Sequence, residues 1–561
     1  MEIKVWEYLK KYRLQLTSIV IFSILTTISG IIVPYLNGNF IDVLISSGSL
    51  DYILRFAAVI IIIGILGAVA SYFVNMSTAK MTANTSFDML SDAIGHVQRI
   101  PYDVFTSRYS PAYLIQRMTG DLNTMFSFFL NNFMNIFLKG ITFIIVLAIV
   151  ATINLEVFLV SLLFLPIYLI CYIALKKPMF ERNREYKERS NHYTKTMFEQ
   201  INRLYEIKVE ATFKKSVETE RKSFAEYLRS LISFNRISYL FTSLDGIIAV
   251  LFQSVILVIG GIQIINGEMS IGEFTIVNTY FTTLLACTKY YFNLGKSIQD
   301  YRSSKTRMEE ILNIEEENNG SIAVEDIDII SVSDVSYTYN PGTTNVINNL
   351  NITFRKGEIT LVRGPNGVGK TTSVNIILGI LQNLNEGVVE YNGIDIQKLD
   401  IYSARENCIS TLIQSTNYPD QTVGDYLKDS LGLEPDGIIG LIKLLELDSI
   451  YINDNFRISD YWDVKINNLS GGQKQRVILL KVLGKNNSVM ILDEPSTGLD
   501  GSGTESLIRY LSKSKNRRIT IIISHDTLFE NISDEVLELS ANQSLNLNSR
   551  HVEVNHAGVQ I

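Results

Sequence analysis

The sequence is poor in the residues that disulfide-bonded, zinc-binding and nucleic-acid-binding proteins require. It has three cysteines, Cys171, Cys287 and Cys408, and five dispersed histidines. An odd, scattered set of cysteines argues against a disulfide framework, and no group has the spacing of zinc ligands. The 50 basic residues are outnumbered by 57 acidic ones, so the chain also lacks the positive excess typical of proteins that act on nucleic acid. We therefore expect no nucleic-acid partner.

Apolar residues are abundant and concentrate in the N-terminal half. They form 47% of the 561 residues, and the mean hydropathy is positive, which is unusual for a soluble protein. Six apolar runs each reach the ~20 residues needed to span the hydrocarbon of a bilayer. They cover residues 16–45, 52–74, 130–153, 155–175, 239–265 and 271–292. This pattern predicts an all-α transmembrane domain of six helices over residues 15–301.

The connections between these runs alternate in length and charge. Those after the first, third and fifth runs are short and carry acids, whereas residues 75–129 and 176–238 are long and rich in Lys and Arg. Because basic loops stay in the cytoplasm, we expect the N-terminus, the long loops and the C-terminal half to be cytoplasmic. Heptad-like apolar spacing predicts that each long loop is a pair of helical arms reaching ~40 Å from the bilayer at 1.5 Å per residue.

Residues 1–14 precede the first run and combine Trp6 and Tyr8 with four basic residues. This composition predicts an amphipathic elbow helix lying on the inner surface of a cell membrane. A plain cytosolic extension is the alternative.

Three ionisable residues, Lys139, Asp245 and Lys289, lie inside predicted spans. A charge at the centre of a membrane helix costs on the order of 3 kcal/mol, so each should face a wet cavity or a partner. In one interpretation Asp245 pairs with Lys139 or Lys289 and holds the helices together. In the other, the three residues line a substrate chamber together with aromatic residues of the sixth run. These are Tyr280, Tyr290 and Tyr291.

After the sixth run the composition changes sharply. Residues 302–325 are acid-rich and low in apolar content, which predicts a linker. An alternating strand pattern then opens a second domain, which we place at residues 326–540. The polar tail, residues 541–561, carries no pattern that indicates a structure or a function.

A glycine-rich turn between a predicted strand and a predicted helix dominates this second domain. Residues 359–372, ITLVRGPNGVGKTT, fit G-x-x-x-x-G-K-[ST]. Glycines let several backbone N–H groups point at one anion, and the following helix adds the positive end of its dipole. Lys370 would then reach the β and γ phosphates of ATP, and the Thr371 hydroxyl would bind Mg²⁺. The other predicted phosphate-loop residues are Gly364, Pro365, Asn366, Gly367, Val368, Gly369 and Thr372. A purely structural glycine turn is the alternative.

Two adjacent acids end a second buried-strand pattern, VMILDEPSTGLD, residues 489–500. Asp493 suits a Mg²⁺ ion held through water, and Glu494 suits the base that orients or deprotonates the attacking water. The stretch LSGGQKQR, residues 469–476, lies just before these acids, and the strand RITIIISHD, which carries His525, lies after them.

With both phosphate-site motifs and LSGGQ in this order, the second domain resembles the nucleotide-binding domain of ATP-binding cassette (ABC) proteins. The resemblance implies an α/β P-loop ATPase domain with a helical subdomain. It also implies that Tyr339 stacks on adenine, that Gln414 binds Mg²⁺ or water, and that His525 holds the γ phosphate and Glu494. In the family, the signature faces ATP bound to the other subunit, and a downstream acid contacts across that interface. Here these residues are Ser470, Gly471, Gly472, Gln473 and Asp500.

The N-terminal half resembles ABC exporters, whose helical arms end in short coupling helices. RIPYDVF and YEIKVEATF, residues 99–105 and 205–213, resemble the two cytoplasmic turns. Two stretches depart from the exporter pattern: residues 460–468 read DYWDVKINN where many exporters have a TEVGE-like segment, and STGLD replaces the usual ALD. Which residues relay motion between the ATPase and the arms is therefore open.

The sequence as a whole predicts a half-size ABC exporter that hydrolyses ATP with Mg²⁺ at a dimer interface in a cell membrane. A homodimer is the simplest arrangement, and a heterodimer is the alternative. Aromatic-rich spans with few charges favour an amphipathic substrate, with a peptide preferred over a drug or a lipid. A membrane sensor or channel gated by ATP is the alternative of another class.

Overall fold

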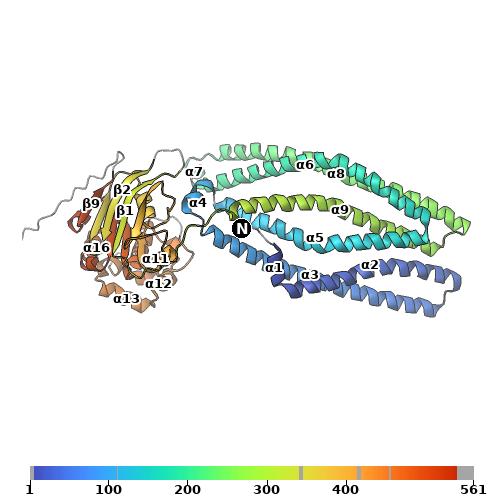
Figure 1. Cartoon of the computed structure of the whole chain (residues 1–561), viewed down its shortest axis with the longest axis horizontal. Coiled ribbons are helices and arrows are strands. Elements are labelled where there is room, and N and C mark those ends of the chain that lie inside the picture. The colour runs from blue at the N-terminus through green and yellow to red at the C-terminus, as the bar shows by residue number, and fades with distance from the viewer. Residues whose placement is uncertain (1–4, 110, 340–344, 414–417, 454–455, 540–561) are drawn as a thin grey trace, which may run out of the picture. The chain divides into compact units, whose positions relative to one another are not determined.

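The computed structural model describes residues 5–109, 111–339, 345–413, 418–453 and 456–539. The chain divides into two compact units. The first comprises Met1–Gly95 and Leu114–Asn313, and the second comprises His96–Tyr113 and Ile314–Ile561. Figure 1 shows long helices in the first unit and a mixture of strands and shorter helices in the second.

The first unit is built from long helices, as the apolar runs predict. The long helices are α2 (Arg13–Ser47), α3 (Leu50–Val97), α5 (Pro111–Ile153), α6 (Leu155–Asn202), α8 (Phe213–Asn266) and α9 (Ile271–Leu312), and they are accompanied by the short helices α1 (Val5–Lys11) and α7 (Leu204–Val209). α6 runs along α8 (Figure 1), and α2 contacts α9. Interlocking aromatic rings fill the centre, where Phe164 of α6 meets Phe252 of α8 and Phe281 of α9 edge-on.

Five of these helices, α2, α3, α5, α6 and α8, are long and apolar enough to cross a membrane. The helix of the sixth predicted span, α9, is not among them, because threonine and asparagine recur along it. It still contributes Tyr280 and Phe281 to the buried core of the first unit. A membrane-spanning role for α9 therefore stays a prediction.

Close backbone contact brings α2 and α9 together. A side chain on Gly272 would meet the carbonyl oxygen of Gly38 at 2.1 Å, so only glycine permits this approach. Asp42 of α2 then accepts hydrogen bonds at the start of α9, from the Ser270 hydroxyl at 2.5 Å and from the Gly272 N–H at 2.7 Å. The Asp42 carboxylate thus satisfies an otherwise unpaired N–H of the first turn of α9.

The N-terminal elbow forms the short helix α1 and is bonded to α3. The Tyr8 hydroxyl donates to Asp92 at 2.7 Å, and the Lys11 ammonium pairs with Asp88 at 2.6 Å. Placement of this helix on a membrane surface stays a prediction.

α9 extends further than the composition suggests. The helix continues to Leu312, so the first part of the predicted linker, residues 302–312, is helical. Met308, Ile311 and Leu312 are buried here while the acids between them are more exposed, which is the spacing of an amphipathic helix. The high content of acidic residues made this helical spacing of apolar residues hard to recognise in the sequence.

The second unit contains two sheets. An antiparallel sheet has the order β2-β1-β4-β5, and a parallel sheet has the order β6-β7-β8-β3-β9. The strands are β1 (Ile329–Tyr337), β2 (Ile347–Arg355), β3 (Ile359–Arg363), β4 (Glu386–Tyr391), β5 (Ile394–Asp395), β6 (Ile409–Leu412), β7 (Val489–Asp493), β8 (Ile519–Ile523) and β9 (Glu535–Glu538).

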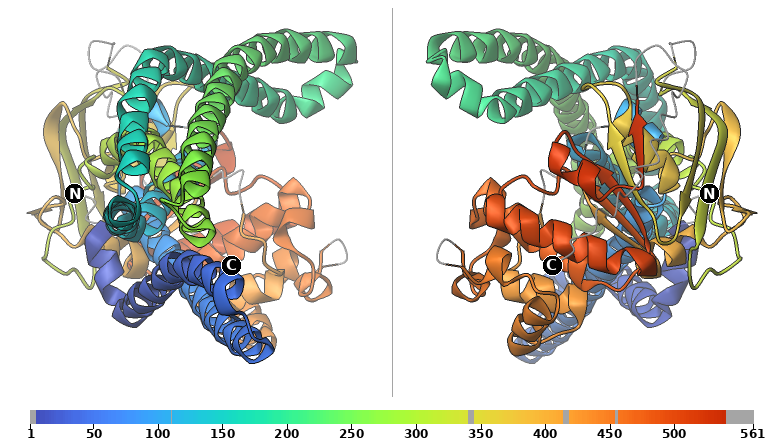
Figure 2. Two further views of the ribbon diagram at one scale, coloured as in Figure 1. Left: turned by 90° about the vertical axis from the view of Figure 1, so that its right-hand side faces the viewer. Right: turned by 90° about the vertical axis from the view of Figure 1, so that its left-hand side faces the viewer.

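Apart from α4 (Tyr102–Arg108), which comes from the segment between α3 and α5, the helices of this unit cover the parallel sheet or form a separate helical part. They are α10 (Lys370–Ile377), α11 (Ile401–Asn407), α12 (Val423–Leu431), α13 (Pro435–Leu444), α14 (Asp448–Tyr451), α15 (Gly471–Gly484) and α16 (Gly501–Ser514). Figure 2 shows the yellow strands β1 and β2 and the orange helices α12 and α13 at opposite ends of this unit. The predicted α/β fold with a helical subdomain is confirmed.

Alternate residues of the central strands face opposite sides of the parallel sheet, as the pleat requires. Ile491 and Ile521 pack in one cluster with Ile376 of α10. Leu492 and Ile522 pack in the other cluster, which includes the hydrophobic face of α15. Because both faces are covered, the strands read as continuous apolar runs.

Candidate functional site

The predicted phosphate, acid and histidine residues meet at one edge of the parallel sheet. β7, β8 and β3 are adjacent and parallel, so their carboxyl ends lie together. Ile523 of β8 pairs with Asp493 on one side and with Val362 on the other. The turns after these three strands therefore carry Glu494, His525 and the phosphate loop to the same place.

The phosphate loop curls around its own lysine. Gly369, with φ of 101°, is the N-cap of α10 and holds a left-handed conformation that favours glycine. The Lys370 ammonium donates to the Gly364 carbonyl at 2.5 Å and lies 3.0 Å from Nε2 of His525, which accepts when neutral. Pro365, Asn366, Gly367 and Thr371 are exposed beside it. An anion above the loop would thus meet backbone N–H groups and the lysine together.

The two acids after β7 have different surroundings. Burial raises the pKa of the Asp493 carboxyl, the charge of Glu494 raises it further, and Lys370 opposes the shift. Glu494 itself has φ of +48°, a left-handed conformation that costs a non-glycine residue about 1–3 kcal/mol. Its N–H donates to the Ile523 carbonyl at 2.8 Å, which holds the strained turn against β8.

Two further residues position Glu494, and the sequence interpretation missed both. The Ser524 hydroxyl donates to Oε2 of Glu494 at 3.1 Å, and the Gln475 amide donates to the Glu494 carbonyl at 2.8 Å. Gln475 lies in the signature stretch and Ser524 lies beside the predicted histidine. The sequence could have suggested these two residues because they lie within recognised motifs. No local pattern, however, predicts which side chain of a motif points toward Glu494.

The signature residues build the start of α15. Ser470 and Gln473 form a capping box: the Ser470 hydroxyl accepts from the Gln473 N–H at 3.4 Å, and the Gln473 side chain accepts from the Ser470 N–H at 2.9 Å. The Gln473 amide also donates to the Tyr461 hydroxyl at 2.9 Å. Tyr461 belongs to the stretch that departs from the exporter pattern, so that stretch contacts the signature directly.

The turn after Asp493 and Glu494 touches the signature backbone. A side chain on Gly498, whose φ is +79°, would meet the Gly472 Cα at 2.7 Å. Asp500 follows as the N-cap of α16, accepting from the Gly503 N–H at 2.7 Å and the Ser502 hydroxyl at 3.0 Å. These hydrogen bonds lower the pKa of the Asp500 carboxyl.

The other predicted nucleotide residues are Tyr339 and Gln414. The Tyr339 hydroxyl lies 3.1 Å from that of Thr372, which places its half-exposed ring beside the start of α10. Gln414 lies outside the described residues.

In the first unit, Asp245 pairs with Lys289 at 2.7 Å. No acidic partner for Lys139 is found within the described ranges. The Tyr280 hydroxyl donates to the Ile31 carbonyl at 2.7 Å from a fully buried ring, which contributes to packing. The Tyr290 hydroxyl donates to the Asn132 carbonyl at 3.2 Å, beside α5.

Two family models match this chain in the order membrane half, then ATPase half. The ABC transporter transmembrane region matches residues 16–287, and the ABC transporter model matches residues 347–497. The chain belongs to the ABC transporters. It is a half-size ABC exporter, a multi-pass membrane protein whose C-terminal domain binds nucleotide and hydrolyses ATP in order to drive export.

Individual relatives agree with this assignment. The transport/processing ATP-binding protein ComA of Streptococcus pneumoniae is 25% identical over 505 residues, covering 88% of this exporter and 69% of that protein. The nisin transport ATP-binding protein NisT of Lactococcus lactis is 28% identical over 259 residues, covering 44% and 42%. A bacterial Atm1-family ABC exporter with ATP bound shares the fold, with a TM-score of 0.80, 16% identity and 94% coverage of both chains.

Proposed function

We propose that this exporter carries a peptide out of the cell and works as a homodimer with two shared ATP sites. The lactococcin-A transport/processing ATP-binding protein LcnC of Lactococcus lactis, 22% identical, is matched over 88% of the chain, which supports a peptide cargo. An ATP-dependent lipid A-core flippase of Pasteurella multocida, 26% identical, is matched over only 52% of the chain. The longer match is the observation that favours a peptide over a lipid.

The donor set at the sheet edge fits Mg²⁺. Hydroxyl and carboxylate oxygens are its preferred ligands, and protein sites often supply only one or two carboxylates besides substrate phosphates. The Asp493 carboxylate and the exposed Thr371 hydroxyl provide such ligands, with Gln414 as a further candidate. When bound, Mg²⁺ would neutralise charge on the β and γ phosphate oxygens.

The residues of the chain would then divide the chemistry of ATP cleavage. Lys370 holds the phosphates, and Glu494 orients or deprotonates the attacking water. Ser524 and Gln475 keep Glu494 aimed at that water through the hydrogen bonds described above. His525, which already contacts Lys370, would hold the γ phosphate while Tyr339 stacks on adenine.

Two exposed features support a dimer. Ser470 is exposed at the start of α15, where the first N–H groups of a helix attract an anion. α7, at the turn between the arms α6 and α8, exposes apolar side chains that a partner would cover. These are Leu204, Tyr205 and Val209, with exposed fractions of 50%, 82% and 67%.

ATP would drive export by favouring a closed pair of ATPase domains. A nearly complete switch requires ATP to bind the closed state about 10⁴-fold more tightly than the open one. The helical arms would transmit this closure to the membrane helices, and hydrolysis would reset the cycle.

Transport into inverted vesicles tests this proposal. Vesicles containing the full chain should accumulate members of a random-sequence peptide library with ATP, as identified by mass spectrometry, and vesicles containing Glu494→Gln should not. Movement of a fluorescent lipid without peptide uptake would overturn the peptide assignment. Dependence on a different half-transporter chain would overturn the homodimer.

A further inference from the structure

α5 carries a polar ridge where a membrane helix should be apolar. Residues four apart form a ridge that winds around a helix by about 40° at each step, and five such positions in α5 are all polar. We call them the α5 ridge: Asn123, Ser127, Asn131, Asn135 and Lys139. The last three fall within the predicted span 130–153, and the next two positions, Phe143 and Leu147, return to apolar residues.

At the level of Asn131 to Lys139, the other side of α5 is also exposed, but it is apolar. Phe137, Ile141 and Ile144 are 58%, 50% and 68% exposed. Asn135 and Phe137 are two residues apart and therefore lie ~200° apart around the helix. The phenylalanine side suits lipid tails, whereas amide side chains facing hydrocarbon would lose their hydrogen bonds. The Asn135 amide keeps one hydrogen bond inside the helix, to the Asn131 carbonyl at 2.6 Å. No such bond is found for the Asn131 amide among the described residues, so this part of the ridge should face water, a partner or a ligand.

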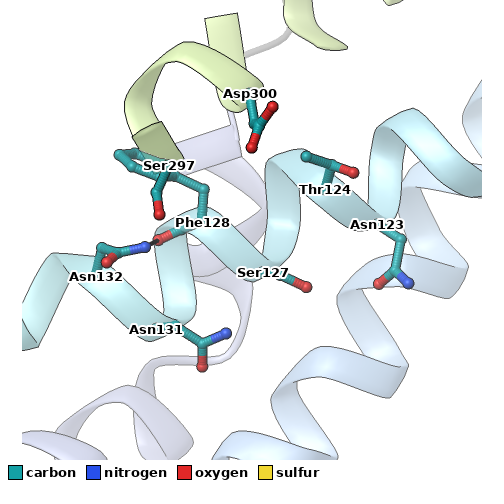
Figure 3. Close-up of a pocket in the computed structure, with 8 residues that line it drawn as sticks. All are labelled: Asn123, Thr124, Ser127, Phe128, Asn131, Asn132, Ser297 and Asp300. Atoms are coloured by element: carbon teal, nitrogen blue, oxygen red, sulfur yellow. Dashed lines mark hydrogen bonds between the residues drawn. The ribbon is translucent and has the colours of Figure 1, made fainter. Parts of the chain in front are cut away.

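A pocket opens along the part of the ridge from Asn123 to Asn131. It has a volume of about 430 Å³, and six lining residues come from α5 while Ser297 and Asp300 come from α9. This is within the range of ~300–1,000 Å³ that ligand sites occupy. Figure 3 shows Asn123, Ser127 and Asn131 projecting from the same side of α5.

The lining offers hydrogen bonds with little net charge. Seven of its eight residues are polar, and Asp300 is neutralised by Lys187 of α6 at 2.5 Å. For the side chains of Asn123, Ser127 and Asn131, no hydrogen bond is found in the part of the chain that the structure describes. Free amides and hydroxyls of this kind match the alternating N–H and C=O groups of a polypeptide backbone and do not depend on its sequence.

The membrane end of the ridge is different, because it carries a charge. Asp245 already neutralises Lys289, so the nearby pair is balanced. Lys139 has no acidic partner among the described residues and is only partly buried. A lone ammonium inside a membrane domain calls for an anion that arrives with a ligand.

We propose that the α5 ridge binds an extended segment of the exported peptide through its backbone, and that Lys139 binds a carboxylate of that peptide. This inference rests on the proposed peptide export. The ridge from Asn123 to Lys139 is ~24 Å long, which about seven extended residues would follow. Recognition of the backbone would make the site tolerant of sequence, and Lys139 would select peptides with a free C-terminus or an acidic residue.

Thiol labelling of single substitutions tests the exposure of the ridge. In nucleotide-free inverted vesicles, Asn131→Cys should react with a charged maleimide about tenfold or more faster than the matched Phe137→Cys, because a charged reagent is excluded from hydrocarbon. The unsubstituted chain gives the background of its native cysteines. Equal labelling rates of the two variants would overturn the proposal. So would a slow reaction of Asn131→Cys together with a disulfide between two copies of the chain, because the ridge would then be covered by a second copy.

Peptide protection tests the ligand. A random library of about ten residues per peptide, long enough to follow the ridge, should slow labelling of Asn131→Cys. With libraries that lack Asp and Glu, adding Lys139→Gln should raise the half-protecting concentration of the free-acid library about tenfold and leave the amidated library unchanged, whereas Lys139→Arg should preserve the preference. All three variants should elute in size-exclusion chromatography as the same folded species as the unsubstituted chain. If the library enters vesicles but does not slow labelling of Asn131→Cys, the ridge is not the peptide site, and peptide export is unaffected. If the library slows labelling but does not enter vesicles, the proposed export is contradicted, and the ridge proposal is not.

Discussion

At the scale of single residues, the ATP site depends on a carboxylate held in a strained backbone. Glu494 combines a left-handed φ with three hydrogen bonds, from Ser524, from Gln475 and from its own N–H to Ile523. Strain of this kind persists only where surrounding contacts over-determine the position, and it is common at active sites.

Glu494→Gln should lower the rate of ATP hydrolysis by about 10²-fold or more, because the amide cannot accept a proton from water. Nucleotide binding should persist, since Lys370 and the phosphate loop are unchanged. Hydrolysis and binding of a fluorescent ATP analogue would both be measured on the purified full chain. Glu505→Gln, an exposed glutamate of α16, is the matched control and should hydrolyse ATP at the parent rate.

Asp493 should make the requirement for Mg²⁺ depend on pH. Its raised pKa means that it takes up a proton at a higher pH than an ordinary aspartate, and a protonated carboxyl is a poor ligand. The Mg²⁺ concentration for half-maximal hydrolysis should therefore rise as pH falls, by at most about tenfold per unit. Excess Mg²⁺ should restore this loss but not one caused by protonation of His525. A constant Mg²⁺ requirement would contradict the assignment of Asp493.

At the scale of elements, the start of α15 and the turn before α16 are joined by a glycine contact. Gly498 lies so close to Gly472 that neither turn can move without the other, and Arg476 of α15 donates to the Gly498 carbonyl at 2.9 Å. This contact connects the signature to the strand that carries the catalytic acids.

Gly498→Ala should therefore destabilise the ATPase domain by about 1–3 kcal/mol, through the positive φ and the overlap with Gly472. Gly501→Ala is the control: it opens α16, and a side chain there meets nothing within 4 Å. That change should be neutral or stabilising by up to about 1 kcal/mol. Thermal unfolding of the full chain carrying Trp6→Phe, followed by the fluorescence of Trp462, would compare them. Equal melting temperatures would rule out the contact as a constraint.

At the scale of the whole molecule, export requires two ATPase domains to act on two sets of membrane helices. If each ATP lies between the phosphate loop of one chain and the signature of the other, a homodimer has two equivalent composite sites. A chain that used its own signature would work alone. These arrangements differ in how inactive chains complement each other.

Lys370→Ala and Ser470→Ala should each abolish hydrolysis in a pure dimer. Coexpressed, they should regain about a quarter of the parent activity, since half of the dimers are mixed and one of their two sites is intact. ATP hydrolysis by the purified mixture would measure this, and post-purification mixing of stable homodimers is the negative control. No recovery on coexpression would show that the sites are not shared.

The sequence alone determined the family and the order of the two halves, and it predicted the ATP-site residues, because these signals are local. A phosphate loop, a strand ending in acids and an apolar run are each contiguous, and their periodicity or spacing is set by one element. Five of the predicted spans are confirmed as helices that are long and apolar enough to cross a membrane. The chemistry expected of Lys370 and Glu494 follows from their residue types and from their positions within contiguous motifs.

Only the tertiary structure decided which distant side chains meet. It paired Asp245 with Lys289 instead of Lys139, placed His525 against Lys370, and brought Gln475 to Glu494. Such pairings depend on the rotation of each helix and on the order of strands in the sheet, which no local pattern specifies. The polar ridge of α5 acquired its significance in the same way, because only packing shows that both sides of that helix are exposed.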